Sequence, residues 1–274
     1  MTALSYIVLV SVTIFLIISS LGEIPLKKGS LNSICQGQKY ERVKEKGFLS
    51  DKLKVKEYMN KNFPEIKTSK IIYETSNPED LRKFNFPDNF VMKCSSGARM
   101  FHIVNNRKYN IEDLVQKAKS FLKINFSNHG YRSIPFFGFE EPHYDYNSKK
   151  ILIEEYLEDI EEFRIMMFKG RVIYYEKTNP TEEGIFYNNN FHELEDIKTM
   201  KTTKNSLEKN ILIKKIEKFC KDFYEKESFE LTRMDFYITK DMKEFYFGEI
   251  TFTPENCRYK YSNKFNDYFK KIQL

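Results

Sequence analysis

Two acidic residues near the end of the chain, Asp235 and Glu249, have a spacing that could support chemistry. The segments 233–238 and 246–252 alternate apolar and polar residues on either side of the polar turn 240–243. Period-2 alternation around a short turn predicts a β-hairpin with one apolar and one polar face. If the hairpin closes over a two- or three-residue loop, the two carboxylates fall opposite or nearly opposite each other, and cross-strand Cβ atoms are about 5 Å apart. Because like charges this close repel, the arrangement favours a cation such as Mg²⁺, held also by nucleotide phosphates.

The same hairpin has a simpler interpretation. A solvated polar face, with Lys240 or Lys243 neutralising the two acids, requires no ligand. Short acidic motifs often match by chance, so the hairpin alone favours this interpretation. Segments earlier in the chain decide between the two.

A second candidate site lies at the end of a predicted strand over 90–94. Lys93 on this strand precedes the small-residue loop 95–98, which reads Ser-Ser-Gly-Ala. Backbone N–H groups of such a loop can bind phosphates, with a lysine as a nearby point charge. A solvent-facing lysine before an ordinary turn fits the same residues, since one glycine is not a phosphate-binding motif.

A third candidate segment is 153–159, which reads Ile-Glu-Glu-Tyr-Leu-Glu-Asp. It resembles a connecting strand whose backbone binds adenine and whose carboxylate holds the ribose. Arg164 and Lys169 follow on a predicted hairpin formed by 163–168 and 171–175, with Lys169-Gly170 at its turn.

The remaining elements place these segments in an α+β fold. Helical spacing predicts helices over 51–62, 78–82, 110–122 and 207–226, and strands are predicted over 70–73, 100–104 and 151–157. The polar, Asn-rich stretch 187–204 is expected to be a loop and 23–50 a linker. Antiparallel hairpins with interspersed helices indicate the α+β class.

Composition limits the possible partners. The chain has 274 residues, 41% hydrophobic content and a net charge of +6, which suits a globular protein with an anionic ligand. The abundant Phe and Tyr form no base-stacking pattern, so no nucleic acid partner is expected. The four cysteines have no metal-like spacing; their even number permits disulfides without requiring them. We expect Cys94 and Cys220 to be buried and unpaired.

The first 22 residues carry no charged side chain. The apolar run 3–21 is long enough to cross a bilayer as a helix, and it also fits a signal peptide or, least well, a buried helix. Lys27 and Lys28 follow the run and no basic residue precedes it, which favours the C-terminal side in the cytoplasm. We expect a single-pass anchor with a cytoplasmic domain; the alternative is a secreted or lumenal domain after cleavage.

The order of these motifs resembles the TupA-like family of the ATP-grasp superfamily, found in teichuronopeptide and other cell-surface polysaccharide synthesis. The segments 51–58, 88–94, 153–159, 163–170 and 233–254 carry the resemblance, which spans roughly 51–256. It implies an ATP-grasp fold of two α+β subdomains, 51–150 and 151–274, after the terminal segment 1–22 and the linker 23–50.

The resemblance also implies roles for individual residues. Lys93 contacts the nucleotide phosphates beneath a flap that includes Ser95, Ser96 and Gly97. The adenine and ribose pocket is lined by Glu154, Glu155, Tyr156 and Leu157.

The remaining roles concern the reacting groups. Asp235 and Glu249 bind Mg²⁺, while Arg164 holds a terminal or acyl phosphate. Arg233 neutralises a substrate carboxylate. The implied cofactors are ATP and Mg²⁺.

The implied reaction is ligation of a carboxylate to an amine through an acyl phosphate, with a cell-surface glycan or glycopeptide precursor as acceptor. The acceptor and the amine donor stay open. The family's phosphate loop carries a His and a second Gly that 93–99 lack. Two alternatives therefore remain: a catalytically weakened module that binds nucleotide or glycan, and an ATP-dependent phosphotransferase.

Overall fold

The structure is a computed structural model that describes residues 28–38, 43–124, 142–144, 147–178, 185–188, 192–196, 201–206, 211–257, 259 and 261–273. Among these residues, no helix has the length and apolar character that a bilayer crossing requires. The apolar run 3–21, expected to be an anchor or signal, lies outside the described residues.

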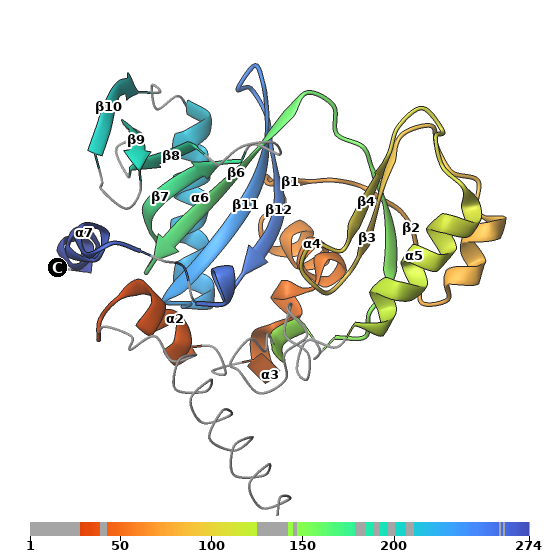
Figure 1. Ribbon diagram of the computed structural model, residues 1–274, viewed down its shortest axis with the longest axis horizontal. Helices are drawn as coiled ribbons and strands as arrows, with labels where there is room; N and C mark the ends of the chain where they lie inside the picture. The colour runs from red at the N-terminus through yellow and green to blue at the C-terminus, as the bar shows by residue number, and fades with distance from the viewer. Residues whose placement is uncertain are drawn as a thin grey trace, which may run out of the picture.

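The larger of two sheets has eight strands in the order β1-β12-β11-β6-β7-β8-β9-β10 (Figure 1). In chain order these are β1 (Lys67–Thr68), β6 (Ile160–Phe168), β7 (Arg171–Lys177), β8 (Ile185–Asn188), β9 (His192–Asp196), β10 (Lys201–Ser206), β11 (Leu231–Thr239) and β12 (Phe245–Thr251). The described pairs are antiparallel except β1 with β12.

Helices cover both faces of this sheet. Helix α6 (Ile211–Glu227) packs Phe219 and Phe223 against the apolar side chains of β6, β11 and β12. On the opposite face, α2 (Leu31–Gln38) and α7 (Asn263–Gln273) pack against β6, β7 and the start of β11. The α2 and α7 contacts cover only one end of their face, which leaves its other end to polar side chains.

The smaller sheet has four antiparallel strands in the order β2-β5-β3-β4. They are β2 (Ile71–Thr75), β5 (Ile151–Glu155), β3 (Phe90–Cys94) and β4 (Phe101–Val104). Helix α5 (Ile111–Lys123) and the 3₁₀ helix η2 (Pro78–Lys83) cover one face. Asn110 caps α5, because its side chain accepts a 2.8 Å hydrogen bond from the N–H of Glu112.

Helix α4 (Lys52–Asn62) lies between the two sheets (Figure 1). Its N-cap is Asp51, whose carboxylate accepts from the N–H groups of Leu53 and Lys54 at 2.9 and 3.0 Å. Val55 and Met59 enter the core of the large sheet. The polar face of α4 is therefore available to the space between the sheets.

Two expectations from the sequence are wrong in this region of the fold. The described residues within 187–204 are not a loop, since β8, β9 and β10 extend the large sheet there. Strands added at a sheet edge can be polar, because an antiparallel sheet tolerates solvent on a face. The described part of 23–50 is not a plain linker: it forms α2, α3 (Val43–Lys46) and η1 (Gly47–Ser50), which bury Leu31, Cys35 and Leu49.

The other predicted elements are present with shifted ends. The strand expected over 151–157 ends at Glu155. The helix expected over 207–226 is α6, described over Ile211–Glu227, and residues 207–210 lie outside the described residues. Two further 3₁₀ turns are η3 (Pro142–Tyr144), which lies beside η1 and α3, and η4 (Pro254–Cys257), which lies beside α2. The α+β class is confirmed.

Candidate functional site

Four charged residues form one row across the large sheet. Arg164 on β6 is the register partner of both Glu176 on β7 and Asp235 on β11, and Asp235 is the partner of Glu249 on β12. Neighbouring strands lie about 4.8 Å apart, so the row spans roughly 15 Å. The prediction that Asp235 and Glu249 lie opposite each other is therefore confirmed. Arg164 and Glu176 extend the row on the other side of Asp235.

The Asp235–Glu249 pair is held by cations on several sides. Asp235 is only 2% exposed and accepts two hydrogen bonds of 2.8 Å from the guanidinium of Arg233. Glu249 pairs with Lys52 at 3.0 Å, and Arg233 lies 3.7 Å from its other oxygen. The two carboxylates thus face each other with a cation on either side.

Their protonation reflects this crowding. Burial raises the pKa of Asp235, and the neighbouring Glu249 carboxylate adds to the rise, while Arg233 opposes it. Burial also opposes ionisation of Glu249, but Lys52, Arg233 and Lys93 outweigh it and lower the pKa of Glu249. A further cation between the two acids would stabilise the fully ionised pair.

The simpler interpretation of the hairpin, a solvated face, is wrong. Lys240 pairs with Asp159 at 3.1 Å and Lys243 with Asp241 at 3.0 Å, so neither lysine neutralises the pair. Asp235 is buried rather than solvated.

A β-bulge at Gly248 sets the geometry of the hairpin. Asp235 pairs with Glu249, but the next residue of β11 pairs with Phe247, which leaves Gly248 without a register partner. Phe247 and Ile250 consequently both enter the core although they are three residues apart. A Cβ at position 248 would lie 2.9 Å from the backbone oxygen of Asp235, so only glycine fits without a shift.

Arg164 stands in the middle of the row among three carboxylates. Its Nε lies 3.3 Å from Glu162 and 4.0 Å from Asp235, and its Nη1 lies 3.7 Å from Glu176. Burial opposes the charged guanidinium, yet these acids raise the pKa of Arg164. None of the three contacts is a close bidentate pair, which distinguishes Arg164 from Arg233.

Lys93 reaches into the same region from the smaller sheet. Its Nζ lies 2.8 Å from Oε2 of Glu154 and 5.5 Å from the centre of the Tyr237 ring on β11. Lys56 of α4 lies 2.6 Å from Oε1 of Glu154, which is itself only 1% exposed. Ser69 donates a 2.9 Å hydrogen bond to the same carboxylate.

Burial and the neighbouring charges shift the pKa values of Glu154 and Lys56. Burial opposes ionisation of Glu154, but Lys93 and Lys56 lower its pKa to about 2. Burial lowers the pKa of Lys56 to about 8, despite the nearby Glu154. Glu154 therefore stays ionised and fixes two ammonium groups on the inner face of the small sheet.

The loop after Lys93 is tied down by its serines. Ser95 and Ser96 are fully buried, although we expected them in a flap over phosphates. The Ser95 hydroxyl donates to Asp51 at 3.1 Å, and the Ser96 hydroxyl donates to the backbone oxygen of Tyr144 at 2.6 Å. These hydroxyls shape the loop and hold it against the start of α4.

Lys52 connects this loop to the acidic pair. Its Nζ donates to the backbone oxygen of Gly97 at 2.8 Å and also pairs with Glu249. Gly97 has φ +128°, a backbone conformation that favours glycine. The predicted phosphate loop and the predicted metal ligands therefore meet at one lysine.

Glu155, Tyr156 and Leu157 lie where β5 of the small sheet leads into β6 of the large sheet (Figure 1). The backbone N–H of Glu155 donates to Lys70 at 3.0 Å, and its side chain accepts from the N–H of Lys70 at 2.7 Å. Tyr156 and Leu157 follow, half-buried. A molecule bound at this connection would contact both sheets.

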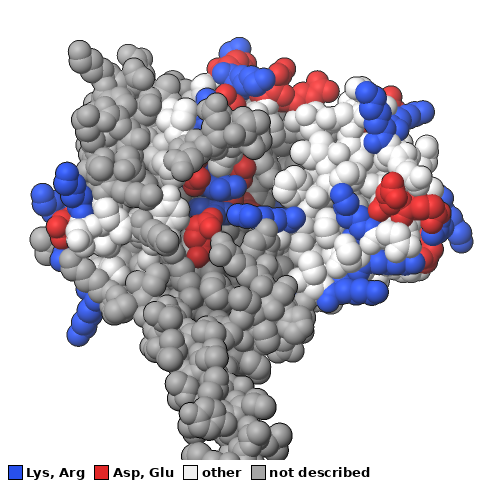
Figure 2. All heavy atoms as spheres, in the orientation of Figure 1, with Lys and Arg blue, Asp and Glu red and all other residues white. Residues whose placement is uncertain are grey.

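The charged side chains gather in the middle of one face. Figure 2 shows basic and acidic side chains side by side there, while the region towards the smaller sheet is mostly uncharged. The ion pairs of the site join residues of α4, β3, β5, β6, β11 and β12.

Sequence reasoning missed four residues of this site, namely Lys52, Lys56, Glu176 and Tyr237. Three of them had a usable signal. Lys52 and Lys56 have the i, i+4 spacing of one helix face. Tyr237 lies two residues after Asp235 and so shares its strand face. Glu176 had no signal, because strand pairing alone brings it beside Arg164.

Comparison with solved structures gives a distant likeness. A D-alanine–D-alanine ligase from Helicobacter pylori superposes with a TM-score of 0.52 and 18% identity, over 82% of this chain and 60% of that one. An L-amino acid ligase from Bacillus licheniformis has a TM-score of 0.48 and 16% identity, over 74% and 42%. At this identity the first likeness shows the fold alone, and the chain spans 60% of that ligase. No curated protein matches the chain.

A family model gives a more direct result. The model described as TupA-like ATP-grasp matches residues 32–270, which is most of the chain. The match includes α4, both described sheets and every charged residue of the site above. This chain belongs to the TupA-like ATP-grasp family.

Proposed function

We propose that the protein is an ATP- and Mg²⁺-dependent ligase that joins a carboxylate to an amine through an acyl phosphate. The observation that carries the proposal is the opposed pair Asp235 and Glu249, surrounded by cations from α4 and both sheets. Family membership supports the use of ATP.

The acidic pair fits Mg²⁺. This ion prefers oxygen ligands and usually takes one or two protein carboxylates, with water and substrate phosphates completing the set. Within the described residues, no group of three or more His, Cys, Asp or Glu could hold a metal without such help. Asp235 and Glu249 therefore suit an ion that arrives with a nucleotide, and that ion would neutralise phosphate charge.

Both sheets carry groups that would bind the nucleotide. Lys93 lies just before the loop 95–97 in the sequence, and Lys52 donates to the backbone oxygen of Gly97, so both suit the phosphates. The connection 155–157 offers backbone groups for the adenine. Tyr237 presents a ring beside Lys93, on the strand face that also carries Asp235.

Arg164 and Arg233 would supply electrostatic stabilisation during transfer. Both guanidinium groups have raised pKa values despite burial, because they lie among carboxylates. A fixed positive charge beside the reacting phosphate stabilises negative charge as it develops. Arg164 has the looser contacts and is the better placed to accept an anionic substrate group.

For the acceptor, we propose a carboxylate on a cell-surface glycan or glycopeptide precursor, such as a uronic acid. The support is the family resemblance alone. Attachment to a membrane through residues 3–21 would bring the domain near such a precursor. The amine donor is open at this stage.

A weakened binding module is the second candidate, and one observation favours it. Both oxygens of Asp235 are already bound by Arg233, which competes with a metal for them. A protein that keeps this pair closed would bind nucleotide or glycan without turnover.

One experiment separates these functions. The purified chain is incubated with Mg·ATP, a panel of uronic acids and amino acids, and hydroxylamine, while ADP and hydroxamate are measured. A ligase forms both products, whereas a phosphotransferase releases ADP without hydroxamate. A binding module retains an ATP analogue without releasing ADP, and absence of binding would refute the nucleotide site.

A further inference from the structure

Glu176 is the one member of the charged row that the nucleotide and metal do not use. It is the register partner of Arg164 on the side away from Asp235. Two strand spacings separate it from Asp235, or about 10 Å. A carboxylate at this end of the row lies beside the arginine assigned to the acyl phosphate, and not beside the metal ligands.

The surroundings of Glu176 are partly closed and rich in tyrosine. Tyr174 on the same strand shares a 3.1 Å hydrogen bond with the hydroxyl of Tyr261, which precedes α7. Both hydroxyls interact electrostatically with Glu176, and Glu255 of η4 acts on Glu176 and Tyr261. The side chain of Glu176 is 20% exposed, so it is accessible to a small group.

We propose that Glu176 binds the incoming amine donor as an ammonium ion and removes its proton. The proposal rests on the ligase function proposed above. The Glu176 carboxylate takes one proton from the ammonium, and the nitrogen lone pair forms a C–N bond with the acyl carbon. The C–O bond to phosphate then breaks, phosphate leaves with the electron pair, and the remaining excess proton on nitrogen passes to solvent.

The charges around Glu176 suit this role. Arg164 and Glu162 face it from β6, Arg233 from β11 and Glu255 from η4. Burial raises the pKa of Glu176, and the two arginines only partly counter this. A carboxylate whose pKa lies above the ordinary value is a stronger base than a solvated one.

Two nucleophiles test the assignment. Hydroxylamine is mostly uncharged near neutral pH, so it needs neither an ammonium site nor a base; methylamine is protonated and needs both. In Glu176→Gln we expect hydroxamate formation to persist, while the methylamide rate falls roughly 10²-fold or more. Glu162→Gln is the control. Glu162 also contacts Arg164, but its other carboxylate oxygen accepts a 3.1 Å hydrogen bond from the hydroxyl of Thr178.

The outcomes are distinct. If Glu176→Gln lowered the rates with both nucleophiles equally, the role of Glu176 in binding the amine would be overturned, because Glu176 would then only hold Arg164. An unchanged methylamide rate would overturn it too. If the unaltered chain formed neither ADP nor hydroxamate, the proposed ligase function would be refuted, and with it the role of Glu176 in binding the amine.

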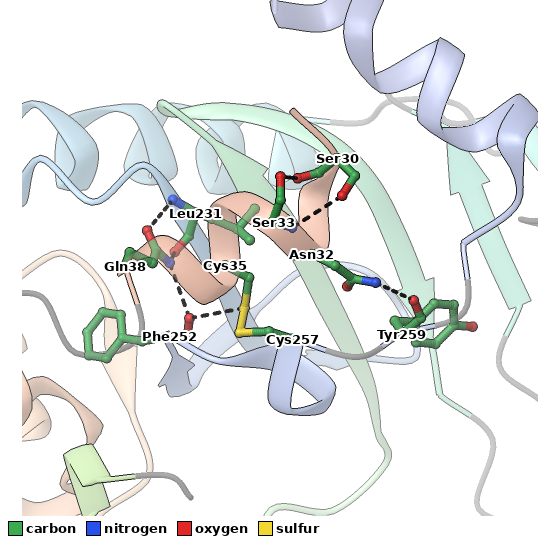
Figure 3. Close-up of a disulfide and its surroundings, with 9 residues drawn as sticks. All are labelled: Ser30, Asn32, Ser33, Cys35, Gln38, Leu231, Phe252, Cys257 and Tyr259. Atoms are coloured by element: carbon green, nitrogen blue, oxygen red, sulfur yellow. Dashed lines mark hydrogen bonds between the residues drawn. A yellow bond between two sulfur atoms is a disulfide. The ribbon is translucent and has the colours of Figure 1, made fainter. Parts of the chain in front are cut away.

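A separate observation concerns the compartment of the domain. Cys35 of α2 and Cys257 of η4 form a disulfide across 222 residues of sequence (Figure 3). Their Cα atoms are 5.3 Å apart, in the usual range for such a bond. Both cysteines are 1% exposed, within the cluster that includes Leu31 and Phe269.

The fold holds these two cysteines together through other contacts as well. Asn32 donates to the backbone oxygen of Tyr259 at 2.7 Å. Gln38 donates to the backbone oxygens of Leu231 and Phe252 at 2.5 and 3.2 Å and accepts from the N–H of Leu231 at 3.1 Å (Figure 3). The disulfide thus reinforces the docking of α2 on the ends of β11 and β12.

We infer that this domain lies on the extracytoplasmic side of a membrane, in an oxidising compartment. Persistent structural disulfides are rare in the cytosol and common outside it. Cys94 and Cys220 are buried and unpaired in other parts of the fold, so the pairing is selective. The run 3–21 would then be a signal or an anchor that delivers the domain across the membrane. This reverses the cytoplasmic orientation favoured by Lys27 and Lys28.

Thiol counting in intact cells tests the inference on the full chain. Thiols are trapped with a permeant maleimide before lysis, and the denatured protein is then treated with a reductant and a mass-tagged maleimide. We expect two newly released thiols in the natural chain and none in Cys35→Ser. No released thiols in the natural chain would overturn the inference.

Sealed vesicles whose cytoplasmic face points outward test the orientation directly. We expect the domain to resist added protease until detergent is present. Digestion without detergent would place the domain in the cytoplasm and overturn the inference, even if the disulfide were formed after lysis.

Discussion

Lys52 and Lys56 lie one turn apart on the same face of α4, and each pairs with a carboxylate on a different sheet. Lys52 is 3.0 Å from Glu249 on the large sheet, and Lys56 is 2.6 Å from Glu154 on the small sheet. Residues four apart on a helix are neighbours, so one short helix links both sheets. The same contacts place positive charge on both sides of the proposed nucleotide site.

The metal assignment predicts a loss of Mg²⁺ dependence in the double variant Asp235→Asn, Glu249→Gln. These two side chains are the only carboxylates of the row that face each other across paired strands, within the residues described. We expect ATP-analogue binding measured by calorimetry to become insensitive to Mg²⁺. The double variant Asp241→Asn, Glu244→Gln at the exposed turn is the control, and Mg²⁺ dependence that survived in the site variant would refute the assignment.

The phosphate assignment predicts that Lys93→Ala binds nucleotide more weakly than Lys108→Ala does. Lys93 lies beside Glu154 and Tyr237 at the junction of the sheets, whereas Lys108 is exposed in a turn after β4. A lost charge-assisted contact costs on the order of 2 kcal/mol, or about 30-fold in affinity. Equal dissociation constants for the two variants would contradict a phosphate role for Lys93.

Local patterns in the sequence were enough to predict the site hairpin, α4, α5 and the strand before the loop 95–98. Each of these has a clear period, a cap or a turn. Hairpin geometry predicted that Asp235 and Glu249 lie opposite or nearly opposite each other. The register set by the turn would pair Asp235 with Gly248, and it is the bulge at Gly248 that makes Glu249 its partner. Short-range information therefore located the two most important carboxylates.

Contacts between distant segments could not be predicted in the same way. Glu176 belongs to the row only because β7 pairs with β6. Lys56 and Glu154 form an ion pair although 98 positions of sequence separate them. Cys35 and Cys257 were two of four possible partners, and spacing does not choose among pairings. Strands β8 to β10 were missed because polar strands at a sheet edge lack the alternation that identifies buried ones.

The bulge at Gly248 predicts a sharp difference between two glycine substitutions. In Gly248→Ala the new Cβ meets the backbone of Asp235 at 2.9 Å, whereas Gly37 in α2 has no atom within 4 Å of its Cβ position. We expect Gly248→Ala to lower the free energy of unfolding by about 1–3 kcal/mol and to weaken metal binding. Gly37→Ala should be neutral or stabilising by up to about 1 kcal/mol, because alanine favours helix. Urea unfolding measures both, and equal effects would show that the hairpin accommodates a side chain at 248.

The buried Glu154 predicts a specific dependence of stability on acid. Its pKa is lowered to about 2 in the folded chain, below the ordinary value of 4.5 for a glutamate. The unfolded state therefore binds the proton first as the pH falls, so the stability from this group is present above about pH 4.5 and is lost towards pH 2. Glu154→Gln should flatten that part of the curve of unfolding free energy against pH.

The same variant should also be less stable at neutral pH. It leaves Lys56 and Lys93 without their shared carboxylate, and breaking a buried pair costs about 3–5 kcal/mol. The control Glu158→Gln alters an exposed acid a few residues further along and should leave both the curve and the neutral value unchanged. Urea unfolding without nucleotide, repeated from pH 7 to pH 2, measures both effects. An acid limb of unchanged slope in Glu154→Gln would mean that the carboxylate is not held ionised by the two lysines.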